Sequence, residues 1–415
     1  MRTRTAALLV GAATVALLAV GCTKDDTGPT TTEGPSGIAV GALLDLTGPG
    51  KTLGIASKAS LEAAIASAKA DGVVVLLDVR DTGSDPDTAA KEIRSLHDKG
   101  IHTVIGPQTS SEAKAVLDFA DKNDMLVVSQ GSTASTLAVA NDALYRMVPT
   151  DKVEGRATAD LVTDGRPGVT LVVAHRDDAG NAGLAQTVTR VATDRGAKGV
   201  AGPTYPAEQP DVAKVAADIA TAVEGATKPV AVYLAGFEEV AGILAAAAGQ
   251  TALAEVPFYG GDGSAQSTAV TGDAAAAGFA ASSPSGFASP LPTLGDDAAP
   301  APAALTDRLK AAGAQPDALA YGAYDALMVV AKIVVGGGAT LEGTALRDQF
   351  AKNAEGYAGV SGKISLDRAG DRASEAFAFW VVCNEVPDFN WRQGGTWNPT
   401  AGDGPGKVVF AGCPG

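Results

Sequence analysis

Hydroxyl-bearing side chains directly after an apolar run could bind an anion such as a carboxylate. Ser110 and Ser111 follow the run Thr103–Ile105 and begin a predicted helix. Free backbone amides at a helix start attract anions, because the positive end of the helix dipole lies there. The same segment has a structural interpretation, since Thr109 and Glu112 form the Thr-x-x-Glu pattern of a capping box. The local pattern alone favours the cap, but a capped helix still presents free donors, so the two interpretations are compatible.

Three further turns follow apolar runs and carry groups able to contact a ligand. They are Ser129–Thr133, Ala235–Glu238 and Gly260–Ser264. Gly131 in the first turn would let a ligand approach the backbone closely. Asp262 in the last turn stands among glycines, where Asp is usually a turn residue. It could equally point a carboxylate into a cleft.

Short apolar strands alternate with Ala-rich helices, and these elements must position the turns. The predicted strands are β-branched with little polar alternation, which is typical of strands covered on both faces: Ile38–Leu44, Val73–Val79, Thr103–Ile105, Met125–Val128, Val169–Ala174, Val230–Leu234 and Val256–Tyr259. The predicted helices are Leu53–Ala70, Asp87–Lys99, Ser110–Asn123, Glu154–Thr163, Ala182–Arg195, Asp211–Glu224, Ala303–Ala312 and Asp317–Val335. This alternation predicts an α/β fold with parallel sheets, whose ligands bind beyond the carboxyl ends of the strands.

Two breaks in the alternation predict two lobes with a cleft between them. One set of strand–helix units stops near Met147–Asp151, and Ser282–Pro302 has the composition of a connector. We place residues 37–149 and 284–360 in an N-terminal lobe and residues 150–283 and 361–382 in a C-terminal lobe. Residues 383–415 are then a C-terminal tail.

Cys22 is a candidate site of lipidation. A basic start and the apolar run Ala6–Val20 are the marks of a secretory signal, so residues 1–21 are expected to be removed. A cysteine after small residues resembles a bacterial lipobox, although Ala19 stands where Leu is usual. A plain cleaved signal with a stray cysteine is the alternative, and a spanning helix would need ~20 apolar residues. Residues 22–36 are polar and predict a disordered tether, so we expect an extracytoplasmic protein anchored by lipid to the cell membrane.

Composition argues against several functional classes. The net charge is −15, and −15 − 2 = −17 without Arg2 and Arg4, which disfavours binding to nucleic acid or to an anionic lipid surface. The three histidines are scattered and no Cys-x-x-Cys pair occurs, so we expect no metal site. The chain also lacks a Gly-x-Ser-x-Gly elbow, which makes a secreted hydrolase the least favoured class. We expect no enzyme and no cofactor.

Two further cysteines lie near the C-terminus. Cys383 and Cys413 are an even pair in a compartment expected to be oxidising, which predicts one disulfide closing the C-terminal tail. The alternative is two unpaired buried thiols.

The ordered set of turns resembles the branched-chain (leucine/isoleucine/valine) amino-acid-binding family of type I periplasmic binding proteins. The motifs recur in order over roughly Ile38 to Val382, and the ordered set is more specific than any single motif. They are Gly48-Pro49, Val104–Pro107 with Thr109–Ser111, Ser129–Thr133, Gly260–Gly263, Tyr321–Ala326, Gly359–Ile364, Leu366-Asp367 and Gly370-Asp371. The resemblance implies two hinged lobes of the Venus-flytrap type. It also implies capture of an amino acid or related small polar ligand for an ABC permease.

The resemblance assigns ligand-binding roles to five positions. Ser110 and Thr133 match residues that bind the α-carboxylate of the ligand, and Gly131 matches a backbone carbonyl that accepts from its α-ammonium group. Asp262 matches the acidic partner of that ammonium group, and Phe237 matches an aromatic side chain that faces the ligand. Charge-assisted bonds of this kind suit a zwitterion.

Two positions depart from the family pattern. Ala179 and Leu53 stand where aromatic side chains commonly flank the ligand, so the resemblance implies a pocket that is roomier or differently shaped from one for leucine. An alternative within the same fold is a ligand sensor that feeds a regulatory partner. Permease and ATPase genes beside this one would favour transport.

The lipid anchor can be tested by replacing Cys22. Cys22→Ala removes the thiol to be acylated, so most of the protein should move from the membrane fraction to the soluble fraction, measured by immunoblotting. Thr23→Ala, a change at the neighbouring position, should leave membrane association as it is. Equal membrane association of the Cys22→Ala protein and the wild type would exclude this anchor.

Overall fold

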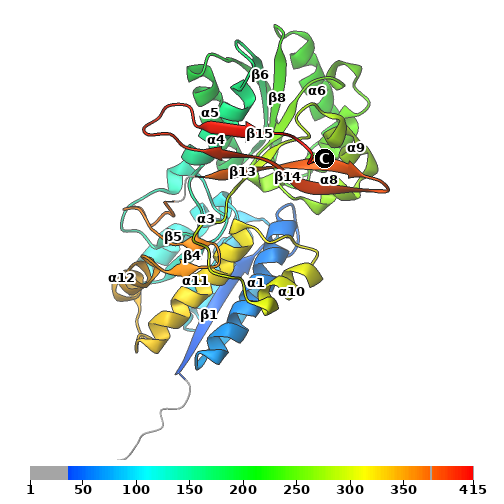
Figure 1. Cartoon of the computed structure of the whole chain (residues 1–415). Helices are drawn as coiled ribbons and strands as arrows, with labels where there is room; N and C mark the ends of the chain where they lie inside the picture. Colours follow the sequence, from blue (N-terminus) through cyan, green and yellow to red (C-terminus); the bar gives the residue numbers. More distant parts are fainter. Residues whose placement is uncertain (1–35, 374–375, 415) are drawn as a thin grey trace, which may run out of the picture. The chain divides into compact units, whose positions relative to one another are not determined.

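Residues 36–373 and 376–414 are described by a computed structural model, in which two lobes each contain a parallel sheet (Figure 1). The first sheet has the order β2-β1-β3-β4-β5, with strands β1 (Ser36–Leu44), β2 (Val73–Asp81), β3 (Thr103–Ile105), β4 (Leu126–Ser129) and β5 (Leu144–Arg146). The second has the order β7-β6-β8-β9, with β6 (Thr170–Asp177), β7 (Lys198–Pro206), β8 (Val230–Ala235) and β9 (Phe258–Gly260). The α/β prediction is confirmed, and every strand predicted above has its counterpart here.

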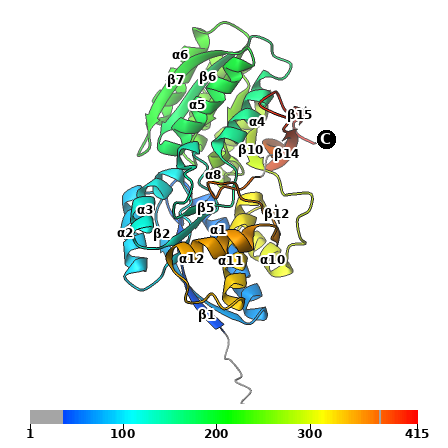
Figure 2. The same ribbon diagram turned by 90° about the vertical axis from the view of Figure 1, so that its left-hand side faces the viewer.

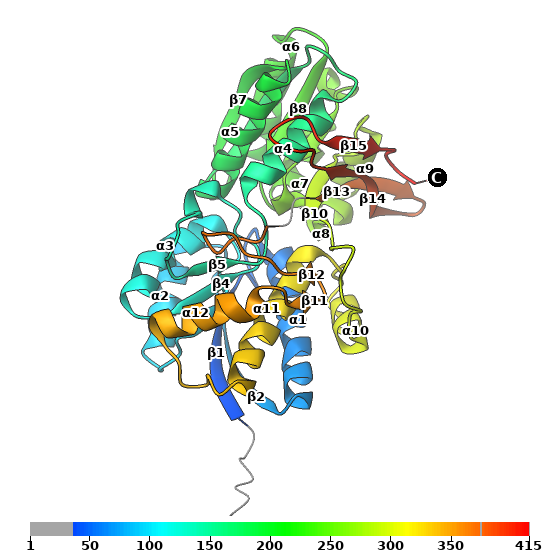
Figure 3. The ribbon, with the colours of Figure 1, turned by 60° about the vertical axis from the view of Figure 1, so that its left-hand side comes forward.

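Helices from both ends of the chain cover the first sheet. They are α1 (Lys51–Ala70), α2 (Pro86–His97), α3 (Ser110–Lys122), α10 (Ala303–Ala311), α11 (Ala318–Val335) and α12 (Gly343–Ala354). α1 and α11 lie side by side and share one apolar core (Figure 3). α11 is long and apolar enough to cross a membrane, but 83 % of it is buried. It is therefore the core helix of this lobe.

The second lobe is built from the middle of the chain (Figure 2). Its helices are α4 (Asp151–Thr163), α5 (Ala179–Asp194), α6 (Val212–Glu224), α7 (Val240–Ala247), α8 (Thr268–Gly272) and α9 (Ala274–Ser282), and 3₁₀ turns occur at Thr251–Leu253 and Asp262–Ser264. A third 3₁₀ turn, Ser135–Leu137, lies in the first lobe. The predicted change of lobe near Met147–Asp151 falls between β5 and α4.

The C-terminal segment is part of the second lobe. An antiparallel sheet of order β10-β13-β14-β15 contains β10 (Ser289–Pro292), β13 (Phe377–Glu385), β14 (Asp388–Asn398) and β15 (Lys407–Phe410). Val382 and Trp391 pack into one core of the lobe, and Phe377 and Trp397 pack into the other. The predicted disulfide between Cys383 and Cys413 is present.

The structure corrects three of the predicted boundaries. Residues 284–292 belong with the second lobe, because β10 pairs with β13. Residues 361–373 belong with the first lobe, where Ile364 packs into the core. The Arg146 guanidinium is paired with Asp371 there at 2.5 and 2.7 Å. Residues 383–414 form sheet strands and no separate tail.

The two-residue strands β11 (Ala358–Gly359) and β12 (Gly362–Lys363) pair with each other. The predicted signal, Cys22 and most of the tether lie outside the described residues.

The disulfide should contribute to the stability of the second lobe. It closes a loop with a sequence separation of 30 residues, so its loss should cost ~3–4 kcal/mol at most on the chain-entropy model. Denaturant unfolding of Cys413→Ser and of wild type, with and without reductant, measures this cost. A non-reducing digest should yield a peptide joining Cys383 to Cys413. Free thiols at both positions in protein from an oxidising compartment would contradict the assignment.

Candidate ligand-binding site

Every residue to which a ligand-binding role was assigned lines one small cavity between the lobes. The cavity has a volume of about 30 Å³, and its lining includes Ser110, Gly131, Thr133, Phe237 and Asp262. It is completed by Leu53, Gln108, Thr109, Asp178, Gly180, Asn181, Leu184 and Gly263. A volume of this size holds water and not an amino acid, so the lobes must separate to admit a ligand.

Two helices begin at this cavity, one from each lobe. α3 begins at Ser110 and α5 begins at Ala179. Ser111 Oγ accepts a hydrogen bond of 3.2 Å from the backbone N–H of Ala179, which joins the two helix starts across the cleft. Helix N-termini favour negative charge, so this end of the cavity suits a carboxylate.

Ser110 is held with its hydroxyl proton free. Its Oγ accepts from the backbone N–H groups of Thr133 and Ala134 at 3.2 and 3.0 Å. A hydroxyl that accepts twice can still donate once, and Ser110 lines the cavity. The capping box of Thr109 and Glu112 is also present, so the local interpretation and the ligand-binding one coexist as expected.

Carboxyl groups also lie at or near the cavity. Asp262 lies in the turn after β9, and Glu154 Oε1 accepts from the backbone N–H of Asp262 at 3.0 Å. Asp151, at the start of α4, is 1 % exposed and neither of its carboxylate oxygens has a hydrogen-bond partner. The side chain of Thr133 lowers the pKa of both Asp151 and Asp262. An ammonium group would be stabilised here.

Loss of solvation on burial has the largest effect on the pKa of each of these carboxyl groups. Loss of solvation, with repulsion from Asp262, raises the pKa of Asp151 to about 7 and that of Glu154 well above its ordinary value. Loss of solvation also raises the pKa of Asp262 to about 6, with Asp178 adding repulsion. No ion pair with Lys, Arg or His is found for Asp151, Glu154 or Asp262 among the described residues.

A larger outer cavity of about 480 Å³ adjoins the small one. The two cavities share Thr109, Asp178 and Phe237. Arg176 lines the outer cavity and lies 5.5 Å from the centre of the Phe237 ring. Its Nε is 2.8 Å from Asp178 Oδ2 and its Nη1 is 3.4 Å from Glu239 Oε2, within ion-pair distance although neither is a well-oriented hydrogen bond. Two carboxylates therefore neutralise this guanidinium.

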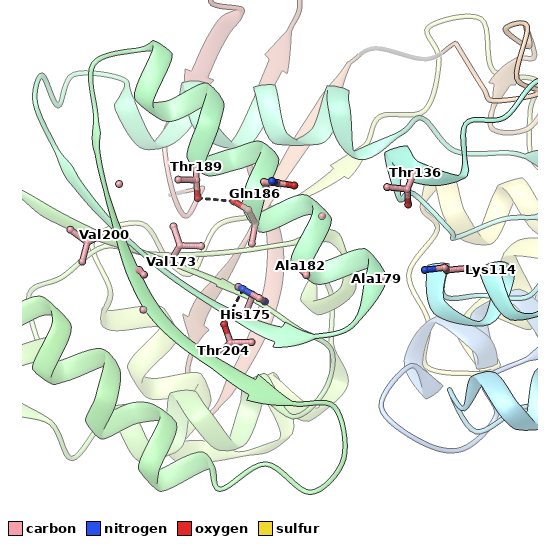
Figure 4. Close-up of a pocket in the computed structure, with 15 residues that line it drawn as sticks. Lys114, Thr136, Val173, His175, Ala179, Ala182, Gln186, Thr189, Val200 and Thr204 are labelled. Atoms are coloured by element: carbon pink, nitrogen blue, oxygen red, sulfur yellow. Dashed lines mark hydrogen bonds between the residues drawn. The ribbon is translucent and has the colours of Figure 1, made fainter.

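The two departures from the family pattern have different positions. Leu53 lines the small cavity, as expected. Ala179 does not, because it faces a separate groove of about 660 Å³ between α5 and β7. Figure 4 shows Ala179, Ala182 and Gln186 along α5 on one side of this groove and Val200 and Thr204 on β7 on the other.

A cluster of polar contacts joins the lobes beside the cavity. Glu238 Oε2 is 2.9 Å from Lys51 Nζ, and the Thr52 hydroxyl donates to Glu238. The backbone N–H of Glu238 also donates to the carbonyl of Pro49 at 3.2 Å. The Glu238 side chain is 10 % exposed. The turn after β8 therefore binds directly to the start of α1 in the other lobe.

Sequence reasoning missed Asp151, Glu154, Arg176 and Glu238. Asp151 was used only to mark a boundary, and acidic residues at a helix start are usually explained by the helix dipole. Nothing in the local sequence signals that the second lobe buries Asp151 or that Arg176 lies above Phe237. These relations depend on segments far apart in the chain.

The chain belongs to the periplasmic binding protein family, whose model matches residues 37–384. Members of this family are solute-binding proteins rather than enzymes, and membership implies an extracytoplasmic location. An uncharacterised protein of Methanocaldococcus jannaschii is 27 % identical over 95 % of this chain and 97 % of its own length. The chemotactic signal transduction system substrate-binding protein BasB of Halobacterium salinarum is 28 % identical over 36 % of this chain and 40 % of its own length.

Solved structures share the fold at low sequence identity. The branched-chain amino acid transporter substrate-binding protein LivJ of Streptococcus pneumoniae, in complex with isoleucine, has a TM-score of 0.65 and 22 % identity over 86 % of this chain and 99 % of its own. A solute-binding protein of an ABC transporter from R. palustris, in complex with benzoate, has a TM-score of 0.68 and 18 % identity over 91 % of this chain and 99 % of its own. At these identities the likeness shows the fold.

The buried carboxyls predict a stability that falls as pH rises. A carboxyl with a raised native pKa binds more protons in the folded state, so the free energy of unfolding decreases between the unfolded pKa, ~4, and the native one. For Asp151 this window ends at about pH 7. Asp151→Asn should therefore raise the free energy of unfolding by roughly 2–4 kcal/mol at pH 8 and by much less at pH 4.

Denaturant unfolding across this pH range, on protein purified free of ligand, measures the effect. Asp194→Asn is a matched control, because Asp194 is 59 % exposed and, among the described residues, pairs only with Arg190 on the outside of α5. It should change the free energy of unfolding by less than ~0.5 kcal/mol at any pH. A pH profile of Asp151→Asn parallel to that of wild type would refute this interpretation.

Proposed function

We propose that this protein captures an amino acid, or a related small zwitterion, between its lobes and delivers it to an ABC permease. The observation that carries the proposal is that groups of both kinds line one small cavity. Two helix starts and the Ser110 hydroxyl can serve an α-carboxylate, and the Asp262 carboxylate can pair with an α-ammonium group.

Ligand binding would proceed by closure of the lobes. The first lobe supplies Ser110, Gly131 and Thr133, and the second supplies Phe237 and Asp262. A ligand that touches both sets binds the closed form better than the open one, so it shifts the population toward closure. The permease would then recognise the closed form. No bond of the ligand is changed.

The location of the protein is part of the proposal. Lipid attached at Cys22 would hold it at the outer face of the cell membrane, next to a permease. The structure of LivJ with isoleucine supports an amino acid as ligand, and the benzoate complex supports a carboxylate.

A second candidate function is that of a receptor. The similarity to the chemotaxis protein BasB favours a regulatory partner in place of a permease. Both functions require the same ligand-binding cleft. Uptake of labelled ligand by cells with and without the gene separates them, because a sensor would alter behaviour or expression and leave uptake unchanged.

Asp262 and Ser110, which would hold the ammonium group and the carboxylate of the ligand, are called the clamp here, and replacing each of them tests it. A thermal-shift screen of amino acids and small carboxylates comes first, since a ligand at 100 times its Kd adds ~2.7 kcal/mol to the free energy of unfolding. Asp262→Asn leaves the ammonium group in a closed cleft without its partner, a loss of ~2–5 kcal/mol. Calorimetry at pH 8 should show affinity roughly thirty-fold lower or worse.

Ser110→Ala should cost less, roughly 1–3 kcal/mol, because amides at the starts of α3 and α5 still serve the carboxylate. Asp194→Asn should bind as the wild type does. If Asp262→Asn binds as tightly as the wild type, Asp262 is a turn residue only. The ligand is then not an amine held in this way.

A further inference from the structure

The cleft has more carboxyl groups in and near it than one ammonium group can pair with. Asp178 and Asp262 are the charged side chains in the lining of the small cavity. Asp151 and Glu154, each 1 % exposed, are outside that lining, and Glu154 accepts from the backbone N–H of Asp262. Asp151 has no hydrogen-bond partner for either oxygen. A zwitterion brings one positive and one negative charge, so its entry leaves this excess as it was.

The outer cavity adds negative charge where a ligand side chain would emerge. Asp85, Asp177 and Glu208 line it together with Asp178. Arg176 is the basic residue of that lining, and its guanidinium is within ion-pair distance of both Asp178 and Glu239. Asp177 and Glu208 are exposed, and the described structure shows no ion pair to either of them.

An apolar wall connects the two cavities. Phe237 lines both of them, and Leu53 and Leu184 line the small one. A methylene chain packs well against such a wall, while a charged end would remain in the polar outer cavity. The cleft thus contains the clamp, the apolar wall and an acidic outer cavity. The carboxylates of that outer cavity, Asp85, Asp177, Asp178 and Glu208, are called the acidic mouth below.

We propose that the ligand is an amino acid with a cationic side chain, held by the clamp at its α-carbon and by the acidic mouth at its far end. This inference rests on the proposed function and names its substrate class. The second positive charge lies near Asp177 and Glu208, to which the described structure shows no ion pair. In a partly desolvated cleft, attraction between opposite charges is stronger than in water.

Calorimetry with L-lysine and L-norleucine tests the inference, because the two ligands differ in the terminal ammonium group of the side chain. At low ionic strength lysine should bind at least about 10-fold more tightly, and the ratio of the two affinities should shrink as salt is added. Asp177→Asn and Glu208→Gln should each lower this ratio about 2- to 5-fold. Asp194→Asn, which removes the same charge away from the cleft, should leave the ratio unchanged. Thermal unfolding of each variant checks that it is folded.

The outcomes separate this inference from the proposed function. Norleucine that binds as tightly as lysine, or a ratio that Asp177→Asn and Glu208→Gln both leave unchanged, overturns the cationic side chain and leaves the amino-acid clamp in place. Binding of benzoate together with failure of both amino acids overturns the clamp, and with it both proposals. Lysine preference that depends on these two carboxylates supports both.

Discussion

Carboxylates at the start of α4 and in the turn after β9 lie under the cleft without a cation to neutralise them in the part of the chain that the structure describes. An ionised carboxylate out of water is costly unless it is paired. The unliganded cleft therefore keeps part of this charge protonated near neutral pH, as the raised pKa of Asp151 indicates. A cationic group that enters the cleft would supply the missing partner. The proposed recognition of a positive charge rests on this imbalance.

The fold determines which helix starts and turns can reach the cleft. Parallel strands end at the same edge of their sheet, and the helices that follow begin there. In the first lobe this brings the start of α3 and the turn after β4 to the cleft, and in the second it brings the start of α5 and the turns after β8 and β9. Helix starts provide positive potential and the turn after β9 provides a carboxylate. Chain topology thus brings both kinds of group, represented by Ser110 and Asp262, to the same cleft.

Hydrophobic periodicity and the position of turns after strands predicted the elements whose structure depends on residues nearby in the sequence. The α/β class and the helices from α1 to α6 followed from periodicity, and the turns that carry Ser110 and Asp262 followed from their place after strands. β5 and β7 were missed, because the first has three residues and the second mixes Gly, Pro and Lys with apolar residues. The composition of Ser282–Pro302 predicts a connector and not β10, since Ser289–Pro292 contains two prolines and its pairing with β13 lies far along the chain. The burial of Asp151 could not be predicted, because it depends on packing between α4, α5 and the first lobe.

Glu238 ties the two lobes together outside the small cavity. Its bonds to Lys51, Thr52 and the backbone of Pro49 form only when the lobes meet, so they favour closure without any contribution from a ligand. This lowers the free energy that the ligand must supply for closure and raises its apparent affinity. The same bonds must break before the ligand can leave, which slows its dissociation. Under the proposed function, the residence time of the ligand would depend on contacts at the start of α1, separately from the groups that recognise the ligand.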